Sequence, residues 1–326
     1  MDFKKYIPSI FAMLLVIAVF VPIALSSGCA RAKDCPIVVS QTDGVVVTRL
    51  QPSYNLIPVG DEVILTAEVQ NKGNAVAENV EAYVWSKPGF QLDPLNANFP
   101  LGTLNPPRLD ICSAGDAQVM TWRLKAGCDP RESVLAIAVE YDYTSVGWAS
   151  IFMVSDNEAE RTAGKFKEKG ENHPSAGPIQ VFLEPLQNEP VIISTDANSQ
   201  KTFNVRAKFK DLGKGTAGDN GEGSVRNILV TTSGPCKFTT DNIGYRAPDG
   251  AVVLNKANNN SIVLTVKKQE AFEILEVEYS GDVSTFTKDF CTINVNADYH
   301  YRELESVREK MGITGTTSQV DKCLNP

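Results

Sequence analysis

Glu62-Val-Ile-Leu-Thr-Ala-Glu-Val-Gln70 is the stretch that decides the fold, with the turn Asn71-Lys-Gly-Asn74 and the segment Asn79-Val-Glu-Ala-Tyr-Val84 that follow it. Apolar and polar side chains alternate along the first of these segments. A period of two residues is typical of a β-strand with one buried face and one face in water. The pattern therefore predicts an antiparallel sheet that is covered on one side, as in a two-sheet sandwich.

The same order of segments recurs in the second half of the chain. The first half has the segments 45–52, 62–70, 71–74 and 79–84. The matching segments of the second half are, in the same order, 179–185, 202–210, the turn Asp211-Leu-Gly-Lys214 and 226–230. The later segments align as 118–124 with 261–267 and 135–141 with 274–279, and each unit ends in a further apolar strand, 147–154 or 285–295. About seven such strands per unit are typical of an immunoglobulin-like domain. The sequence predicts an all-β chain with two tandem Ig-like antiparallel β-sandwiches.

The first unit also resembles a CARDB-type domain, an Ig-like module of prokaryotic, including archaeal, cell-surface proteins that is linked with adhesion. The resemblance rests on 65–84, where Val69, Asn71 and Gly73 match the family's V-x-N-x-G turn, and on the Gly115-Asp116 turn before 117–124. The second unit resembles the family less, because its turn at 211–223 is much longer. The resemblance implies an Ig-like fold and a cell-surface location, and it transfers no catalytic residue.

Residues 1–29 have the order of an export signal. Lys4 and Lys5 precede the apolar run 6–25, and small residues then lead to Cys29. Three interpretations stay open: a cleaved signal peptide, an N-terminal apolar helix retained as a membrane anchor, and a lipoprotein signal. Leu25-Ser-Ser-Gly-Cys29 resembles a lipobox with the leucine one position early, which implies lipidation of Cys29. All three interpretations place the body outside the cytoplasm, and an anchor or a lipid would hold it on the extracytoplasmic face of the cell membrane, at the cell surface.

Composition and motifs exclude several classes of function. A net charge of −8 without a cluster of basic residues argues against nucleic-acid binding. Two histidines without CxxC or HExxH motifs argue against zinc, and no phosphate-binding glycine motif is present. We therefore expect no enzyme and no cofactor. Trp85, Trp122 and Trp148 are expected in the core or on a sheet face.

Two further sites are considered on single motifs. Asp219 and Glu222 lie among glycines, as ligands do in calcium loops, but without the EF-hand spacing, and a solvated loop is the simpler interpretation. Asn259 begins an Asn-x-Ser triplet and is a glycosylation candidate.

The remaining segments complete the predicted domain plan. Residues 36–155 and 178–297 form the two domains, and the charged stretch 156–177 between them reads as a linker or a long loop. Within 298–326, Tyr301, Leu304, Val307 and Met311 share one helical face and Gly312 offers a stop. This spacing predicts a short C-terminal helix that is followed by a loose tail.

Seven cysteines outside the reducing cytoplasm indicate disulfides. If Cys29 is lipidated, six remain and allow 15 pairings. Cys112 and Cys128 flank a strand of about eight residues, or about 26 Å, whereas bridged Cα atoms lie within about 7 Å. An Ig-like topology would place Cys35 and Cys112 at the same end of the first unit and would allow Cys236 to bridge Cys291 inside the second. Cys323 is then expected to return to Cys128 at the junction between the domains.

These features predict a membrane-anchored extracytoplasmic surface protein. Its Ig-like modules would serve adhesion, envelope structure or protein–protein contacts, with the membrane and an extracellular protein or envelope component as partners. Two alternatives stay open. One is an extracellular filament or pilus subunit in which a strand or tail completes the next copy. The other is a calcium-dependent solute-binding protein or hydrolase that uses the loop with Asp219.

Overall fold

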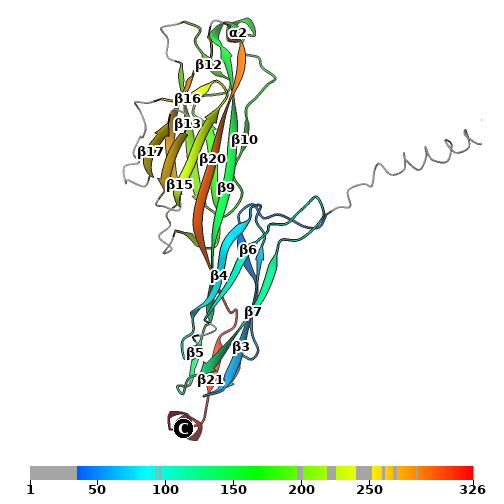
Figure 1. Ribbon diagram of the computed structural model, residues 1–326, viewed down its shortest axis with the longest axis vertical. Coiled ribbons are helices and arrows are strands. Elements are labelled where there is room, and N and C mark those ends of the chain that lie inside the picture. Colours follow the sequence, from blue (N-terminus) through cyan, green and yellow to red (C-terminus); the bar gives the residue numbers. More distant parts are fainter. Residues whose placement is uncertain are drawn as a thin grey trace, which may run out of the picture.

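The computed structural model shows an elongated, mainly β-stranded body with two units along its long axis (Figure 1). The described residues are 35–92, 94, 97–196, 201–218, 225–239, 252–258, 261–266, 270–283 and 285–325. Most of the neighbouring strands are antiparallel, and the all-β prediction is confirmed.

The first unit packs a four-stranded sheet against part of a larger sheet. The four strands, in spatial order, are β1 (Val45–Pro52), β3 (Glu62–Asn71), β7 (Ala117–Ala126) and β5 (Phe90–Leu92). The facing strands are β6 (Asn98–Leu104), β4 (Ala77–Ser86) and the first half of β9 (Ala136–Ser155). Val63, Leu65, Ala67 and Val69 of β3 are all buried, as is Trp122 of β7. The alternation that predicted this strand is therefore the inside–outside alternation of the first unit.

The second unit has the same plan. One sheet has the order β11 (Ile179–Pro185), β13 (Thr202–Asp211), β19 (Glu270–Tyr279) and β16 (Cys236–Phe238). The facing strands are β17 (Val252–Asn258), β18 (Ser261–Val266), β15 (Val225–Ser233) and the first half of β20 (Lys288–Ser306). Phe203, Val205, Ala207 and Phe209 of β13 are buried.

One long antiparallel ribbon joins the two units. Every residue of β20 from Lys288 to Ser306 has a partner in β9, from Val154 back to Ala136. The first half of β9 also pairs with β4 of the first unit, and the first half of β20 pairs with β15 of the second. A single ten-stranded sheet therefore runs through both units.

The helix predicted within 298–311 is wrong, because 298–306 is the end of β20. The apolar residues at helical spacing coincide with a second pattern of period two, in which Tyr299, Tyr301 and Glu303 are buried. Leu304, which the helical face requires inside, is exposed. Pairing with β9 decides between the two patterns, and that partner lies about 160 residues earlier in the chain.

The two units repeat the same turn and the same tyrosine. In the first turn the Gly73 amide donates to Asn71 Oδ1 (3.0 Å), and the Ala75 amide donates to Tyr143 Oη (3.0 Å). In the second turn the Gly213 amide donates to Asp211 Oδ1 (3.3 Å), and the Gly215 amide donates to Tyr301 Oη (3.0 Å). A Cβ on Gly73 would lie 2.1 Å from Tyr143 Oη, and one on Gly213 would lie 2.2 Å from Tyr301 Oη. Only glycine fits under either hydroxyl.

The repeat has an approximate two-fold axis at the middle of the ribbon. Tyr141-Asp142-Tyr143 lies opposite Tyr299-His300-Tyr301, so that Asp142 pairs with His300. The later part of the sequence alignment is corrected accordingly. β7 corresponds to β19, because they pair with β3 and β13, and β9 corresponds to β20. The alignments of 118–124 with 261–267 and of 135–141 with 274–279 were therefore wrong, and 147–154 continues β9 instead of forming a separate strand.

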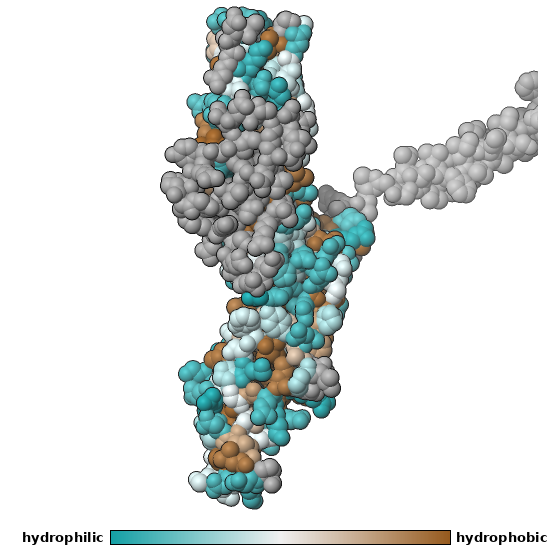
Figure 2. Space-filling model, turned by 60° about the vertical axis from the view of Figure 1, so that its left-hand side comes forward, coloured by the Kyte–Doolittle hydropathy of each residue, from teal (hydrophilic) through white to brown (hydrophobic). Residues whose placement is uncertain are grey.

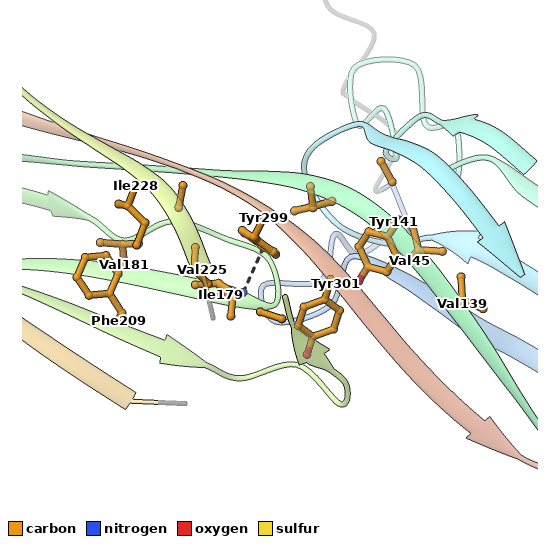
Figure 3. Close-up of a cluster of buried hydrophobic side chains, with 14 of the residues drawn as sticks. Val45, Val139, Tyr141, Ile179, Val181, Phe209, Val225, Ile228, Tyr299 and Tyr301 are labelled. Atoms are coloured by element: carbon orange, nitrogen blue, oxygen red, sulfur yellow. Dashed lines mark hydrogen bonds between the residues drawn. The ribbon is translucent and has the colours of Figure 1, made fainter. Parts of the chain in front are cut away.

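Buried side chains follow the ribbon from one unit into the other. Figure 3 shows Val139, Tyr141 and Val45 on the side of the first unit, and Ile179, Val181 and Phe209 on the side of the second, with Tyr299 and Tyr301 between them. Tyr299 Oη accepts from the Ile179 amide (3.2 Å) and lies 2.8 Å from Ser145 Oγ. The junction is therefore packed core, with tyrosine hydroxyls that serve backbone groups of the loops.

The charged stretch 156–177 folds back onto the ribbon. It begins with α2 (Asp156–Arg161) and ends with β10 (Glu171–His173), which pairs with β9. β12 (Val191–Ile193) runs parallel to the end of β9, and β14 (Thr216–Ala217) pairs with β20. In the structure, residues 156–177 therefore run back along β9.

The C-terminal chain closes the far end of the first unit. β21 (Met311–Thr314) lies between β2 (Leu56–Pro58) and β8 (Arg131–Ser133) in a small sheet. The tail then forms α3 (Thr317–Leu324), whose first turn has a capping box between Thr316 and Gln319. The Thr316-Thr-Ser-Gln319 pattern is the sequence signal for this helix, although the tail was expected to be loose.

Three disulfides join the described cysteines in the expected pairs. They link Cys35 to Cys112, Cys128 to Cys323 and Cys236 to Cys291, with Cα–Cα distances of 5.6, 5.5 and 5.8 Å. The second bridge fixes α3 at the outer end of the first unit (Figure 1), whereas the sequence placed it at the junction between the domains.

Several predictions fall on residues outside the described ranges. They concern the N-terminal segment with Cys29, the calcium candidates Asp219 and Glu222, and the glycosylation candidate Asn259. Among the described residues, no helix is both long and apolar enough to cross a membrane.

We expect Tyr301→Phe to lower the free energy of unfolding by about 1–3 kcal/mol, because it leaves the Gly215 amide without its acceptor and removes one of the hydrogen bonds to Asp211. Tyr143→Phe should have an effect of similar size in the first unit. Urea unfolding at neutral pH measures both. Tyr54→Phe at an exposed position is the control and should change the value by less than about 0.5 kcal/mol.

Stability should also depend on the protonation of Glu303, which is 3% exposed. Burial, together with Asp43, raises the pKa of Glu303 to about 7, although Lys214 opposes the shift. The folded state then holds the proton more tightly than the unfolded state does. The stabilisation that Glu303 contributes is present below its unfolded pKa of about 4.5. It is lost as pH rises through about 7, which lowers the free energy of unfolding by about 3 kcal/mol.

Urea unfolding between pH 4.5 and pH 8 checks this expectation. Glu303→Gln should flatten the decrease in part. Glu273 is also buried, and burial raises its pKa to about 7, so it should contribute a further part of the decrease. Val119→Ala, at an exposed position without a titratable group, should leave the shape of the profile unchanged. An unchanged profile in the Glu303 variant would contradict the role given to this carboxyl.

Candidate contact site

The outward face of the β9–β20 ribbon carries a connected cluster of polar and aromatic side chains. The cluster lies where the two-fold axis of the repeat crosses the sheet. We call it the waist cluster. It consists of Asn79, Tyr83 and Trp85 from β4, Glu140 and Asp142 from β9, and His300 and Arg302 from β20.

Glu140 is the centre of the waist cluster. It accepts from Arg302 Nε and from Tyr83 Oη (2.7 Å), and its second oxygen lies 3.7 Å from His300 Nε2. Burial acts to raise the pKa of Glu140, but the hydrogen bonds from Tyr83 and Arg302 and the positive charge of Arg302 lower it overall. Burial and the same hydrogen bond raise the pKa of Tyr83 to about 12. The carboxylate is therefore ionised at neutral pH, and the phenol is protonated.

Trp85 is the exposed aromatic of the waist cluster. Its side chain is half exposed, at 50%, and the Arg302 guanidinium lies 5.1 Å from its ring centroid. The ring of Tyr83 is 6.2 Å away. The cation–π contact holds the indole against the sheet, while Glu140 holds the guanidinium. Trp85 is thus a rigid apolar surface beside fixed charges.

A β-bulge sets the other side of the waist cluster. The register of β4 against β9 shifts between Glu78 and Glu81, and Asn79 has φ +50°. This backbone turns Asn79 so that its Nδ2 donates to Asp142 Oδ2 (2.8 Å), while Asp142 Oδ1 lies 2.8 Å from His300 Nδ1. Bulges often redirect side chains at functional positions.

A shallow groove beside the cluster is acidic. It is lined by Ala75, Val76, Glu78, Asp142, Tyr143, Thr144 and Asp298. Thr144 Oγ1 donates to Asp298 Oδ1 across the ribbon (2.7 Å). The lining contains three carboxyl groups and no basic side chain. No group of three or more metal-ligating side chains suited to an ion occurs among the described residues.

The same sheet face continues into the second unit. There Trp148 of β9 stacks on His173 of β10, with ring centroids 4.1 Å apart. Both histidines of the chain and two of its three tryptophans therefore lie on this face, whereas Trp122 is buried. Reading β20 as a helix and 171–173 as a linker hid the fact that His300 and His173 share a face.

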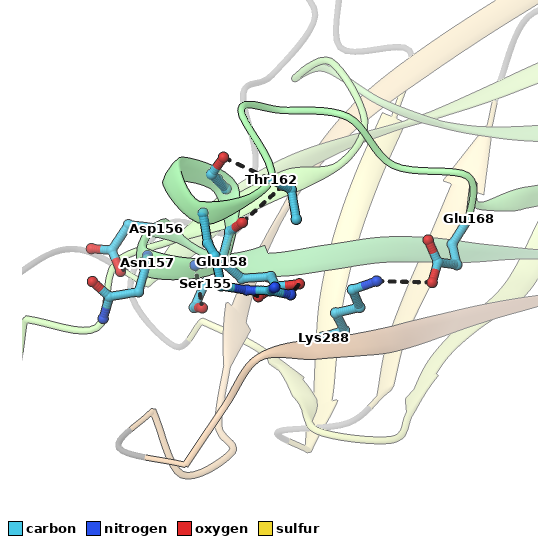
Figure 4. Close-up of polar contacts among 9 residues, drawn as sticks. Ser155, Asp156, Asn157, Glu158, Thr162, Glu168 and Lys288 are labelled. Carbon is cyan, nitrogen blue, oxygen red and sulfur yellow. Dashed lines mark hydrogen bonds and ion pairs between the residues drawn. The ribbon is translucent and has the colours of Figure 1, made fainter.

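A second polar cluster caps the far end of the second unit (Figure 4). Asp156 accepts from the Thr195 amide and hydroxyl and from Ser194, and Ser155 caps α2. Arg161 binds Glu158, and Lys288 binds Glu168 (2.9 Å). These bonds tie α2 and its loop to β12 and β20. Hydrogen bonds and ion pairs within this one end of the second unit explain why all the side chains of the cluster are there.

The waist cluster has the chemistry of a contact surface. It offers an aromatic face, ionised acceptors and a guanidinium in a fixed geometry. The six described cysteines are elsewhere, in the three disulfides, and Cys29 lies outside the described residues. Nothing in the sequence marked Glu140 or Arg302, although each lies next to a Tyr-x-Tyr motif, at 141–143 and 299–301.

Comparisons with known proteins do not assign a family. No protein-family model and no curated protein matches the chain. The resemblance to CARDB-type domains stays a prediction.

Solved structures give weak likenesses. The secreted serine protease VesC from Vibrio cholerae is 9% identical with a TM-score of 0.22, and the match covers 83% of this chain and 52% of the protease. The collagen adhesin (CNA) from S. aureus is 10% identical with a TM-score of 0.23, over 84% of this chain and 93% of that one. Domains 5–6 of the S-layer protein SbsC are 11% identical with a TM-score of 0.15, over 84% and 100%. Likenesses at these TM-scores carry no argument about this chain.

We expect Arg302→Ala to lower the free energy of unfolding by about 2–3 kcal/mol, because it leaves the largely buried Glu140 without its cation. Arg131→Ala is the matched control, since Arg131 pairs with Asp129 at the surface and should contribute less than about 0.5 kcal/mol. Urea unfolding of both variants measures the difference. Equal effects would show that Glu140 is solvated and that the waist cluster is not preorganised.

Proposed function

We propose that this chain is an extracytoplasmic surface protein, held at the membrane by its N-terminal segment, whose two Ig-like modules make adhesive contacts with another protein. Three disulfides support the oxidising compartment, because such bridges are rare in the cytosol. The export signal at residues 1–29 supports the tether.

The observation that carries the proposal is the preorganised Trp85–Arg302–Tyr83 surface on the shared ribbon. Trp, Tyr and Arg are the residues most enriched at the energetic centres of protein interfaces. Here Glu140 holds Tyr83 and Arg302 by hydrogen bonds, and Arg302 holds Trp85 by the cation–π contact. Because these side chains are already ordered, a partner would lose little conformational entropy in binding them.

The charge of the neighbouring groove indicates the kind of partner. Glu78, Asp142 and Asp298 face it without a basic residue, so lysine or arginine side chains of a partner would be complementary. The partner that fits best places an apolar or aromatic residue on Trp85 and a basic residue in the groove.

Location is tested on cells that produce the full chain. Protease shaving of intact cells should remove the body, and non-reducing peptide mass spectrometry of the membrane fraction should recover all three bridges. A chain that resists shaving until the cells are lysed, with free thiols, would contradict an extracytoplasmic surface protein.

The contact is tested by binding of the labelled protein to cells that lack it. Trp85→Ala should weaken binding at least about tenfold, as expected for an interface centre. Val119→Ala removes another exposed apolar side chain, on β7, and should leave binding unchanged. Full binding by the Trp85 variant would rule out the waist cluster as the contact surface.

A further inference from the structure

Three of the most exposed apolar side chains lie close to a single disulfide. Val38 is 82% exposed, Ile111 59% and Leu109 54%. Val38 follows Cys35 by three residues, and the other two precede Cys112 by one and three residues. The Cys35–Cys112 bridge therefore gathers apolar side chains from the start of the described chain and from the loop between β6 and β7.

This loop has a fixed shape. Arg108 and Ser113 exchange both backbone hydrogen bonds (2.8 and 2.9 Å), which closes the loop that carries Leu109 and Ile111. Arg108 also pairs with Asp110 (2.8 Å), and Cys112 has φ +54°. Leu109 and Ile111 are thus presented to solvent by a closed turn that a disulfide reinforces, and not by a long open loop.

The loop lies where the chain leaves the body. The first described residues and this loop project from the side of the molecule, close to the middle of its long axis (Figure 1). Hydrophobic residues lie beside hydrophilic ones at this projection (Figure 2). Cys35 follows Cys29 by six residues, which span at most about 20 Å, and it follows Leu25 by ten residues, or about 35 Å.

We propose that the loop 107–113 rests on the lipid bilayer and inserts Leu109 and Ile111 at the boundary between headgroups and acyl chains. The inference rests on the membrane tether of the proposed function. With the tether in place, the Cys35–Cys112 bridge keeps Leu109 and Ile111 close to the bilayer. Their transfer from water to lipid is favourable, and the loop does not first have to diffuse to the membrane.

The charge near the loop is more favourable for contact with anionic headgroups than the charge of the rest of the molecule is. The chain carries a net charge of −8, but Arg31 and Lys33 lie between Cys29 and Cys35, and Arg108 lies in the loop. Basic residues next to an anchor are attracted to anionic lipids. Asp34 and Asp110 partly offset them, so apolar insertion is the main attraction.

The contact would also orient the body. A tether and a loop at the middle of an elongated molecule hold it along the bilayer instead of upright. Both ends and the waist cluster then keep a fixed distance from the membrane, as a contact surface needs.

The first test places a tryptophan reporter in the full chain. The full-length variants Leu109→Trp and, as a control, Ile192→Trp are reconstituted into phosphatidylcholine–phosphatidylglycerol vesicles with or without brominated acyl chains. Ile192 is an exposed residue of β12, at the end of the second unit that is far from the loop. After subtraction of the wild-type signal, the reporter at 109 should be quenched several-fold more than the reporter at 192. Vesicle flotation establishes tethering in the same samples.

The second test measures cleavage by trypsin after Arg108, analysed after reduction. Cleavage in vesicles should be at least about tenfold slower than in detergent, whereas cleavage after the exposed Arg161 should be equal in both. The variant Leu109→Glu/Ile111→Glu keeps the disulfide and should restore cleavage at Arg108.

The outcomes separate the loop contact from the tether. Flotation with equal quenching at both reporters, or with unprotected Arg108, would overturn the loop contact and leave the tether in place. Absence of flotation would overturn the tether and the loop contact together.

Discussion

Backbone pairing along the β9–β20 ribbon is the constraint on which the rest of the structure depends. Each strand is the last strand of one unit and extends into the other, so each unit is completed by the partner strand. The hydrogen bonds of the ribbon are therefore also the bonds between the units. A flexible linker could not hold the waist cluster together, because its residues come from strands that belong to different units.

The two faces of the ribbon have different structural roles. Inward, the four tyrosines 141, 143, 299 and 301 fill the junction, and the hydroxyls of Tyr143 and Tyr301 hold the two glycine turns. Outward, Glu140 with Arg302, Asp142 with His300 and Thr144 with Asp298 form a ladder of polar pairs. Period-two alternation in two short motifs thus produces both the packing of the junction and the contact surface.

The sequence predicted what local patterns determine. Alternation in β3 and β13 placed the buried faces, and the matching turns at 71–74 and 211–214 revealed the repeat. The pairs Cys35–Cys112 and Cys236–Cys291 followed from the expected strand topology, whereas the position of Cys128–Cys323 at the outer end of the first unit did not.

The sequence could not predict the ribbon, because its paired residues are separated by about half of the chain. Residues 301–311 satisfy a helical spacing, but 299–303 also satisfy a strand spacing, and pairing with β9 selects the strand as far as Ser306. The waist cluster was missed for the same reason. Glu140 and Arg302 are ordinary strand residues until the register places them opposite each other.

Native-state hydrogen exchange of the disulfide-bonded protein tests most directly whether the ribbon makes one body of the two units. We predict that amides of β3, β13 and the whole of β9 and β20 exchange with one common free energy of opening, since neither unit can unfold without losing the shared strands. A second unit whose amides exchange at a distinctly lower free energy, while β9 stays protected throughout, would contradict the account.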